Sequence, residues 1–150
     1  MKRILLLTTG LAIALGAGTA LAQVKPEIMV KQRQAAMTLQ AKYLGGMVPM
    51  AQGKVPFRAD VVAYNASLLD ALSRMPWDGF AESTKDAKSA ALPAIWNEPA
   101  KFKQAQDNFH NAVDALVRAS KGGDEAAMKS AIGGVGKACG GCHENFRQKQ

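Results

Sequence analysis

Four stretches of this 150-residue chain carry apolar side chains at helical spacing, and proline- and glycine-rich segments separate them. The expected helices run from Pro26 to Gly45-Gly46 or a turn beyond, from an N-cap at Asp60 to just before Pro76, from Pro99 to Lys121-Gly122-Gly123, and from Asp124 onward. Nowhere do apolar and polar residues alternate as in a strand. Four amphipathic helices of this length predict one all-α domain, a four-helix bundle.

The apolar positions of each expected helix fall on one face. These positions are Val30, Met37 and Leu44 with Arg33 and Ala41 between them, then Val61, Leu68, Leu72 and Met75, then Phe102, Phe109, Val113 and Leu116, and finally Met128, Ile132, Val135, Cys139, Cys142 and Phe146. The long middle connection, residues 76–99, holds both tryptophans and is expected to pack against the bundle.

The N-terminus has the features of a bacterial secretory signal. Lys2 and Arg3 precede a short apolar run that ends in Ala20-Leu21-Ala22. Residues 1–22 are therefore expected to be removed, which leaves residues 23–150 as one periplasmic domain. No second apolar run is long enough to cross a bilayer, so no membrane insertion is expected after cleavage.

The formal net charge of the whole chain is +7, and its charges are scattered. Without a basic stripe and interleaved aromatics, nucleic-acid binding is not expected. A positive surface fits docking of an acidic redox protein, whose identity the sequence does not give.

Both cysteines and one of the two histidines lie in the segment CGGCH near the C-terminus. On a helix, Cys139, Cys142 and His143 emerge from one face within one turn. The motif C-x-x-C-H indicates covalent attachment of c-type haem. Three alternatives fit less well: a zinc site needs four ligands, a redox dithiol usually sits beside strands, and a disulfide between residues three apart would constrain almost nothing.

Glycine is unusually dense on this last helix, at positions 133, 134, 136, 140 and 141. Each glycine costs about 1 kcal/mol of helix propensity against alanine. The cost is explained if the backbone lies close to a large planar group. A kinked or frayed helix end is the alternative.

The whole mature chain resembles cytochrome c′, the bundle class of c-type cytochromes. The resemblance rests on QVKPEIMVKQRQAAMTL (23–39), PWDGF (76–80), PAIWNEPAKFKQ (93–104) and VGKACGGCHENFRQ (135–148). It implies an up-down-up-down bundle with one haem c covalently attached to the last helix, and iron that is five-coordinate and high-spin.

The resemblance also implies roles for single residues. Cys139 and Cys142 would form the thioether bonds to the haem, and His143 would be the axial ligand of the iron. Arg33 would contact a haem propionate, and Met37 would line the distal side. Trp77 and Phe80 would make aromatic contacts to the haem, and Arg147 would lie on its proximal side. A methionine can also ligate haem iron. Met37, or else Met29, would then give a low-spin Met/His electron-transfer cytochrome. His110 is expected at the surface.

The expected function is binding of NO and CO in the periplasm, with a capacity for one-electron transfer. A distal side without a hydrogen-bond donor would hold O₂ poorly. No first-helix histidine could serve a peroxidase as acid or base. The protein is therefore expected to bind gases and transfer electrons and not to be an enzyme, with turnover of NO as the alternative. Family members commonly dimerise through their first two helices. A second apolar set, Ile28, Ala35, Leu39 and Met47 with Val62 and Leu69, fits such a homodimer.

Overall fold

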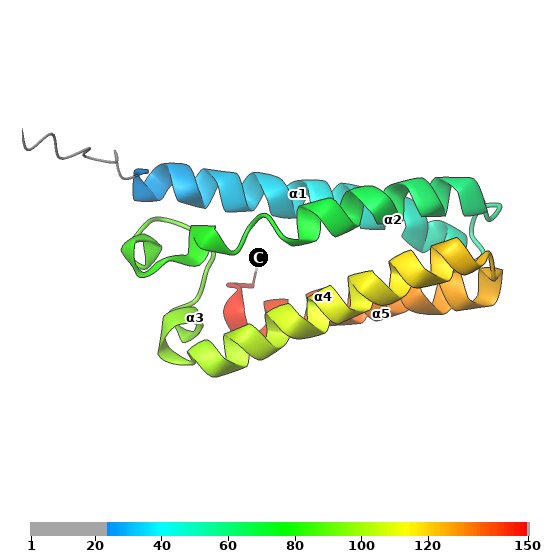
Figure 1. The fold of residues 1–150 in the computed structure, drawn as a ribbon. Coiled ribbons are helices and arrows are strands. Elements are labelled where there is room, and N and C mark those ends of the chain that lie inside the picture. Colours follow the sequence, from blue (N-terminus) through cyan, green and yellow to red (C-terminus); the bar gives the residue numbers. More distant parts are fainter. Residues whose placement is uncertain (1–23, 150) are drawn as a thin grey trace, which may run out of the picture.

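A computed structural model describes residues 24–149, so the expected signal peptide lies outside the described residues. Four long helices run antiparallel to their neighbours (Figure 1). They are α1 (Pro26–Ala51), α2 (Ala59–Ser73), α4 (Pro99–Gly122) and α5 (Glu125–Phe146). Helix α1 packs against α2 and α5, and α4 packs against the same two helices. The all-α four-helix bundle is therefore confirmed, and residues 24–149 contain no strand beyond one isolated bridge.

The outer helix boundaries follow local sequence signals. Helix α1 opens on Pro26, whose missing N–H is not needed in a first turn. The turn between α4 and α5 also agrees with the sequence. Gly123 takes the left-handed backbone conformation (φ 77°), and the Asp124 carboxylate accepts a hydrogen bond of 2.7 Å from the N–H of Ala127.

Helix α1 continues beyond Gly45-Gly46 and ends at Ala51. Met47 and Met50 in this added turn are both buried. Burial of two large apolar side chains offsets the propensity cost of the two glycines. Of the two ends that the sequence analysis gave for this helix, Gly45-Gly46 or a turn beyond, the later one is confirmed.

Helix α2 differs from expectation in its start and its buried face. Arg58, not Asp60, is the N-cap residue, and the Asp60 carboxylate pairs with Arg58 at 2.8 Å. The side chains facing the core are those of Val62, Ala66, Leu69, Leu72 and Ser73. Of the expected stripe, Val61 and Leu68 are only half-buried, and Met75 is exposed. The helix is rotated by about one residue from the expected orientation.

Two apolar clusters fill the bundle. The larger includes Met47, Leu69, Val113, Leu116 and Ile132, each at most 1% exposed. The smaller is centred on Ile95, Phe102 and Phe146. Within residues 24–149, no helix is long and apolar enough to cross a membrane.

The middle connection packs against one end of the bundle, as expected (Figure 1). It contains two 3-10 turns, Asp78–Phe80 and Glu82–Thr84, and the short helix α3 (Ala94–Asn97). The Trp77 ring lies edge-on to the rings of Phe102 and Phe109, with centroids 6.1 and 6.3 Å away. The indole N–H of Trp96 donates to the carbonyl of Phe80 at 3.0 Å.

Candidate functional site

A cavity of about 570 Å³ lies between α1, the middle connection, α4 and α5. It is lined by all eight residues for which a site role is expected, Arg33, Met37, Trp77, Phe80, Cys139, Cys142, His143 and Arg147. These residues come from three separate parts of the chain, and the fold brings them to one place. Met29 is not among the lining residues, and its backbone carbonyl lies against Gly79.

Both cysteines are free thiols and half-buried. Burial raises the pKa of Cys139, and burial together with the neighbouring Cys139 raises the pKa of Cys142 to about 11. Both groups are therefore protonated at neutral pH. A redox-active dithiol needs a lowered thiol pKa, so the raised pKa values of Cys139 and Cys142 do not favour that alternative.

The described part of the chain also fails to assemble a zinc site. No three His, Cys, Asp or Glu side chains within residues 24–149 converge on a point where they could hold an ion. A structural zinc needs four such ligands. The two cysteines and His143 instead face the open cavity.

His143 lines the cavity and is exposed, one residue after Cys142 on the last full turn of α5. Desolvation, and secondarily the positive charge of Arg147, lowers the pKa of His143. An imidazole must be neutral to bind a metal. The local environment therefore favours the ligand form of this side chain.

Arg33 is buried on α1, with only 3% of its surface exposed. Its guanidinium donates to the carbonyl of Gly79, to the Thr84 hydroxyl at 3.1 Å and to the Ser89 hydroxyl at 2.9 Å. It also lies over the Phe80 ring, 4.3 Å from the centroid. Burial lowers the pKa of Arg33, although guanidinium stays protonated at neutral pH. None of these partners is an anion, so a buried cation faces the cavity without a carboxylate from the described residues.

Gly79 allows the middle connection to approach α1 closely. A Cβ at this position would lie 2.7 Å from the Cβ of Arg33 and 3.0 Å from the carbonyl oxygen of Met29. Only a glycine fits between them. The same connection pairs with the C-terminal segment, since Leu92 N–H donates to Phe146 O at 3.0 Å and Gln148 N–H donates to Ala90 O at 2.8 Å. Arg147, which follows α5, is held at this pairing.

The wall that α1 contributes is less apolar than the sequence analysis expected. Gln40 lines the cavity and is buried, and its side-chain amide donates to the carbonyl of Leu72 at 2.8 Å. The expectation of a distal side without a hydrogen-bond donor did not take this amide into account. Gln40 lies seven residues after Arg33 and three after Met37, and this helical spacing could have identified it.

Ser89 and Thr84 are further residues that sequence reasoning missed. Their hydroxyls accept hydrogen bonds from the Arg33 guanidinium, although Ser89 lies 56 and Thr84 51 residues further along the chain. A serine and a threonine in an irregular segment carry no periodic signal that would single them out.

His110 is not a simple surface residue, contrary to expectation. It is partly buried, and its ring lies edge-on to Trp77 with centroids 5.5 Å apart. The Trp77 indole nitrogen lies 2.7 Å from the carbonyl oxygen of Ser73 and 2.9 Å from Nε2 of His110. His110 thus packs against Trp77, which lines the cavity, without lining the cavity itself.

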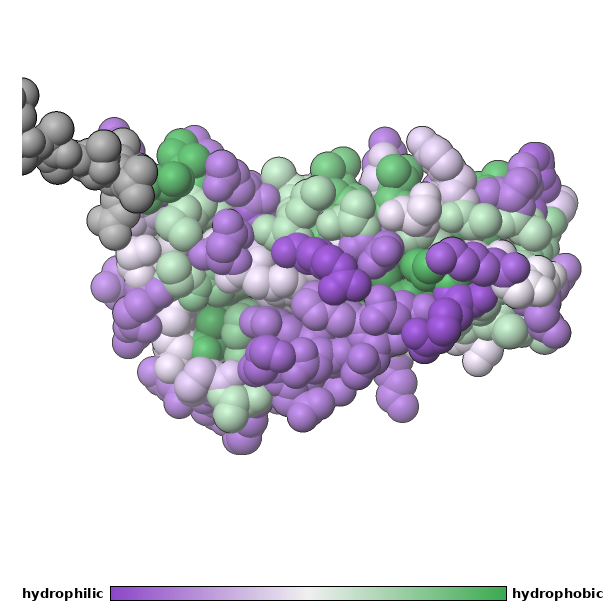
Figure 2. Space-filling view, in the orientation of Figure 1, coloured by the Kyte–Doolittle hydropathy of each residue, from purple (hydrophilic) through white to green (hydrophobic). Residues whose placement is uncertain are grey.

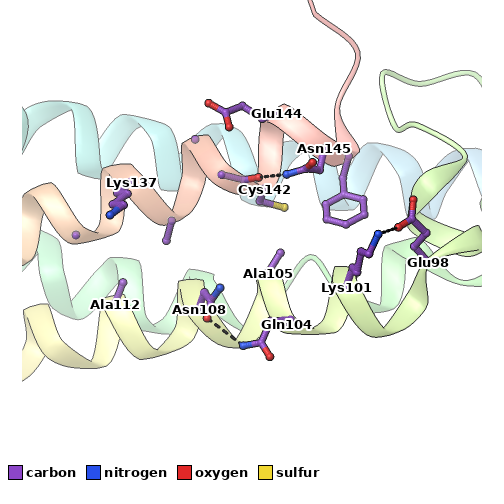
Figure 3. A pocket seen from close by; sticks show the side chains of 15 residues that line it. Glu98, Lys101, Gln104, Ala105, Asn108, Ala112, Lys137, Cys142, Glu144 and Asn145 are labelled. Atoms are coloured by element: carbon purple, nitrogen blue, oxygen red, sulfur yellow. Dashed lines mark hydrogen bonds and ion pairs between the residues drawn. The ribbon is translucent and has the colours of Figure 1, made fainter.

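The five glycines of α5 do not interrupt the helix, which continues from Glu125 to Phe146. This result contradicts the alternative of a frayed end. A Cβ at any of these glycines would meet no atom within 4 Å. Gly134, Gly140 and Gly141 border an open groove of about 850 Å³ between α4 and α5. Figure 3 shows the groove, with Cys142 on its α5 side and the Lys101–Glu98 pair at one end.

The residues around the cavity fit a haem. The cavity has the size of a cofactor pocket, its inner walls are rich in aromatic side chains, and two protonated thiols and a neutral imidazole stand on one turn of α5. The buried guanidinium of Arg33 offers a partner for a carboxylate of the group.

The sequence model of the family described as cytochrome c′ matches residues 28–147. Cytochrome c′ of Rubrivivax gelatinosus is 45% identical over 126 residues, which cover 83% of this chain and 98% of that protein. Cytochrome c-554 of Cereibacter sphaeroides is 37% identical, over 93% of this chain and 94% of that protein.

Solved structures give the same result. The crystal structure of the Rubrivivax gelatinosus protein superposes with a TM-score of 0.80 at 44% identity, over 83% of this chain and 98% of that one. A nitric oxide complex of a cytochrome c′ mutant from Alcaligenes xylosoxidans has a TM-score of 0.80 at 38% identity, over 85% and 99%. From its sequence, its fold and the shape of its site, this chain belongs to the cytochrome c′ family, whose members carry covalently bound haem c.

Proposed function

We propose that this protein is a periplasmic haem c protein that binds NO and CO at a five-coordinate iron and can transfer single electrons. One observation carries the proposal: the cavity places Cys139, Cys142 and His143 of α5 on one side and Met37 of α1 among its other lining residues. Nitric oxide and carbon monoxide complexes of relatives from Alcaligenes xylosoxidans support the ligand class.

In this proposal Cys139 and Cys142 hold one haem per chain through thioether bonds. The experiment is mass spectrometry of the mature protein, combined with acid-acetone extraction. We expect the mass of residues 23–150 plus one haem, and haem that stays with the protein. Extractable haem, or a mass without the increment, would refute covalent attachment.

His143 would hold the iron as its proposed protein ligand, and Met37 would line the side where a diatomic ligand binds, without ligating the iron. When bound, the haem supplies an iron that takes a diatomic ligand and exchanges one electron. The reduced protein should then bind CO and NO without prior mutation, and the oxidised protein should have a high-spin visible spectrum. Optical titration of the reduced protein with CO provides the test.

A second candidate is a low-spin Met/His electron carrier. The position of Met37 in the cavity supports it, since a thioether sulfur can ligate haem iron. Met29 is a poorer ligand candidate because its side chain does not line the cavity. The far-red sulfur-to-iron band of the oxidised protein, together with failure to bind CO, would favour this candidate over gas binding.

Arg33 is proposed to bind a haem propionate. A guanidinium has five N–H donors, and the structure gives three of those of Arg33 to the middle connection. The remaining donors and the unneutralised charge suit a carboxylate. Trp77 and Phe80 would contact the ring, and Arg147 would stand on the proximal side beside His143.

A homodimer through the outer faces of α1 and α2 is proposed with a changed set of residues. Met47, Val62 and Leu69, expected at the interface, are fully buried in the core of the single chain. Ile28, Ala35 and Leu39 remain exposed, Ile28 and Leu39 at 42% and 41%, and Tyr64 on α2 is 64% exposed. Figure 2 shows apolar surface over the α1 and α2 side of the molecule, whereas the α4 side is mostly polar.

A further inference from the structure

Gln40 belongs to the stripe of α1 that faces the cavity. Arg33, Met37, Gln40 and Leu44 are spaced by four, three and four residues, which places them on one helical face, and all four line the cavity. Gln40 is 9% exposed. A buried amide among apolar neighbours costs free energy unless it is hydrogen-bonded, and the bond to the carbonyl of Leu72 uses only one of the two N–H groups of Gln40.

Capping of α2 does not explain Gln40. Its amide donates to the carbonyl of Leu72 at 2.8 Å. That carbonyl also accepts the backbone N–H of Met75 at 3.2 Å, so it would keep a partner without the glutamine. The bond to Leu72 does, however, fix the direction of the side chain.

The amide retains capacity for a further bond. A glutamine has two N–H donors and one carbonyl oxygen, and among the described residues one N–H is used, on Leu72. Arg33, Gln34 and Thr38 are the other polar side chains of α1 that line the cavity, and Gln34 and Thr38 are exposed. The Thr38 hydroxyl donates to the carbonyl of Gln34 at 2.8 Å, and Arg33 holds the middle connection.

We propose that Gln40 is a specificity-determining residue, which donates its second N–H to a diatomic ligand bound in the cavity. A donor at this position favours ligands that carry negative charge on their outer atom, so it raises affinity for NO and O₂ relative to a pocket lined by hydrocarbon alone. The inference rests on the proposed gas-binding function and adds to it a residue that selects among gases.

The experiment compares Gln40→Leu with Gln32→Leu in the haem-loaded protein. Gln32 lies on the same helix but is exposed and does not line the cavity. The infrared stretching frequency of bound CO and the CO dissociation rate are measured for each.

A hydrogen bond to bound CO weakens the C–O bond and strengthens the bond between CO and the iron. We expect the stretch of Gln40→Leu to move to higher frequency and CO to leave about fivefold faster, the effect of one ordinary hydrogen bond. Gln32→Leu should match the wild type.

A merely structural role for Gln40 gives a different result. Thermal unfolding would then shift to lower temperature while the CO stretch and dissociation rate stayed at wild-type values, and that outcome overturns the inference. If Gln40→Leu does not hold haem, Gln40→Asn decides, because its shorter amide removes the donor from its place while it keeps a polar group. An unchanged stretch in that variant also overturns the inference. Failure of the wild type to bind CO at all would instead refute the proposed gas-binding function.

Discussion

Replacement of Gly79 by alanine tests whether the close contact between the middle connection and α1 holds the cavity together. The added Cβ would lie 2.7 Å from the Cβ of Arg33 and 3.0 Å from the carbonyl oxygen of Met29. Both atoms are fixed to the backbone of α1, so neither can turn away as a flexible side-chain end could. The connection must therefore move off the helix.

The expected cost has two parts. Overpacking of this kind costs about 1–3 kcal/mol. Displacement of Gly79 also weakens the hydrogen bond that its carbonyl accepts from the buried Arg33, and a bond to a charged group contributes about 1.5–3 kcal/mol. Because relaxation relieves part of each, we expect Gly79→Ala to lower the free energy of unfolding by about 2–4 kcal/mol.

The assay is urea unfolding of the haem-loaded protein, followed by circular dichroism. Gly45→Ala is the matched control, since Gly45 is an exposed helical glycine of α1 whose added Cβ would meet no atom within 4 Å. The control should gain up to about 1 kcal/mol from helix propensity. A Gly79→Ala protein as stable as the wild type would show that the connection does not depend on this contact.

Three further substitutions test separate parts of the molecule. Met37→Ala should speed CO binding in stopped-flow measurements by removing the side chain that is proposed to cover the ligand side of the iron; an unchanged rate would show that Met37 does not obstruct CO. Leu39→Glu should shift the light-scattering mass from dimer to monomer at micromolar concentration, and it contradicts the proposed interface if the dimer persists. Asp124→Ala should lower the free energy of unfolding by about 1 kcal/mol, because the N-cap bond to Ala127 is lost, and an equal midpoint in urea would count against that cap.

The sequence by itself determined the four long helices, several of their ends and the composition of the C-x-x-C-H motif. These features depend on residues close together in the chain. Gly123 and Asp124 set the turn before α5 through their own backbone and side-chain preferences. Cys139, Cys142 and His143 share a face because any helix of this spacing brings them together. Such features need no tertiary information.

The tertiary structure decided which side of α2 is buried. Val61 and Val62 are adjacent, as are Leu68 and Leu69, so two neighbouring apolar stripes compete for the core. The helical periodicity of apolar residues favours burial of either stripe almost equally. Packing against α1 and α4 selected the stripe of Val62 and Leu69, and this choice removed both residues from the expected dimer interface.

The partners of the polar residues in the cavity also depended on the tertiary structure. Arg33 reaches Ser89, which lies 56 positions further along the chain, and Gln40 reaches Leu72 across the α1–α2 contact. No local pattern encodes such pairs, because a buried polar group takes whichever partner the packing of distant segments brings within hydrogen-bond distance.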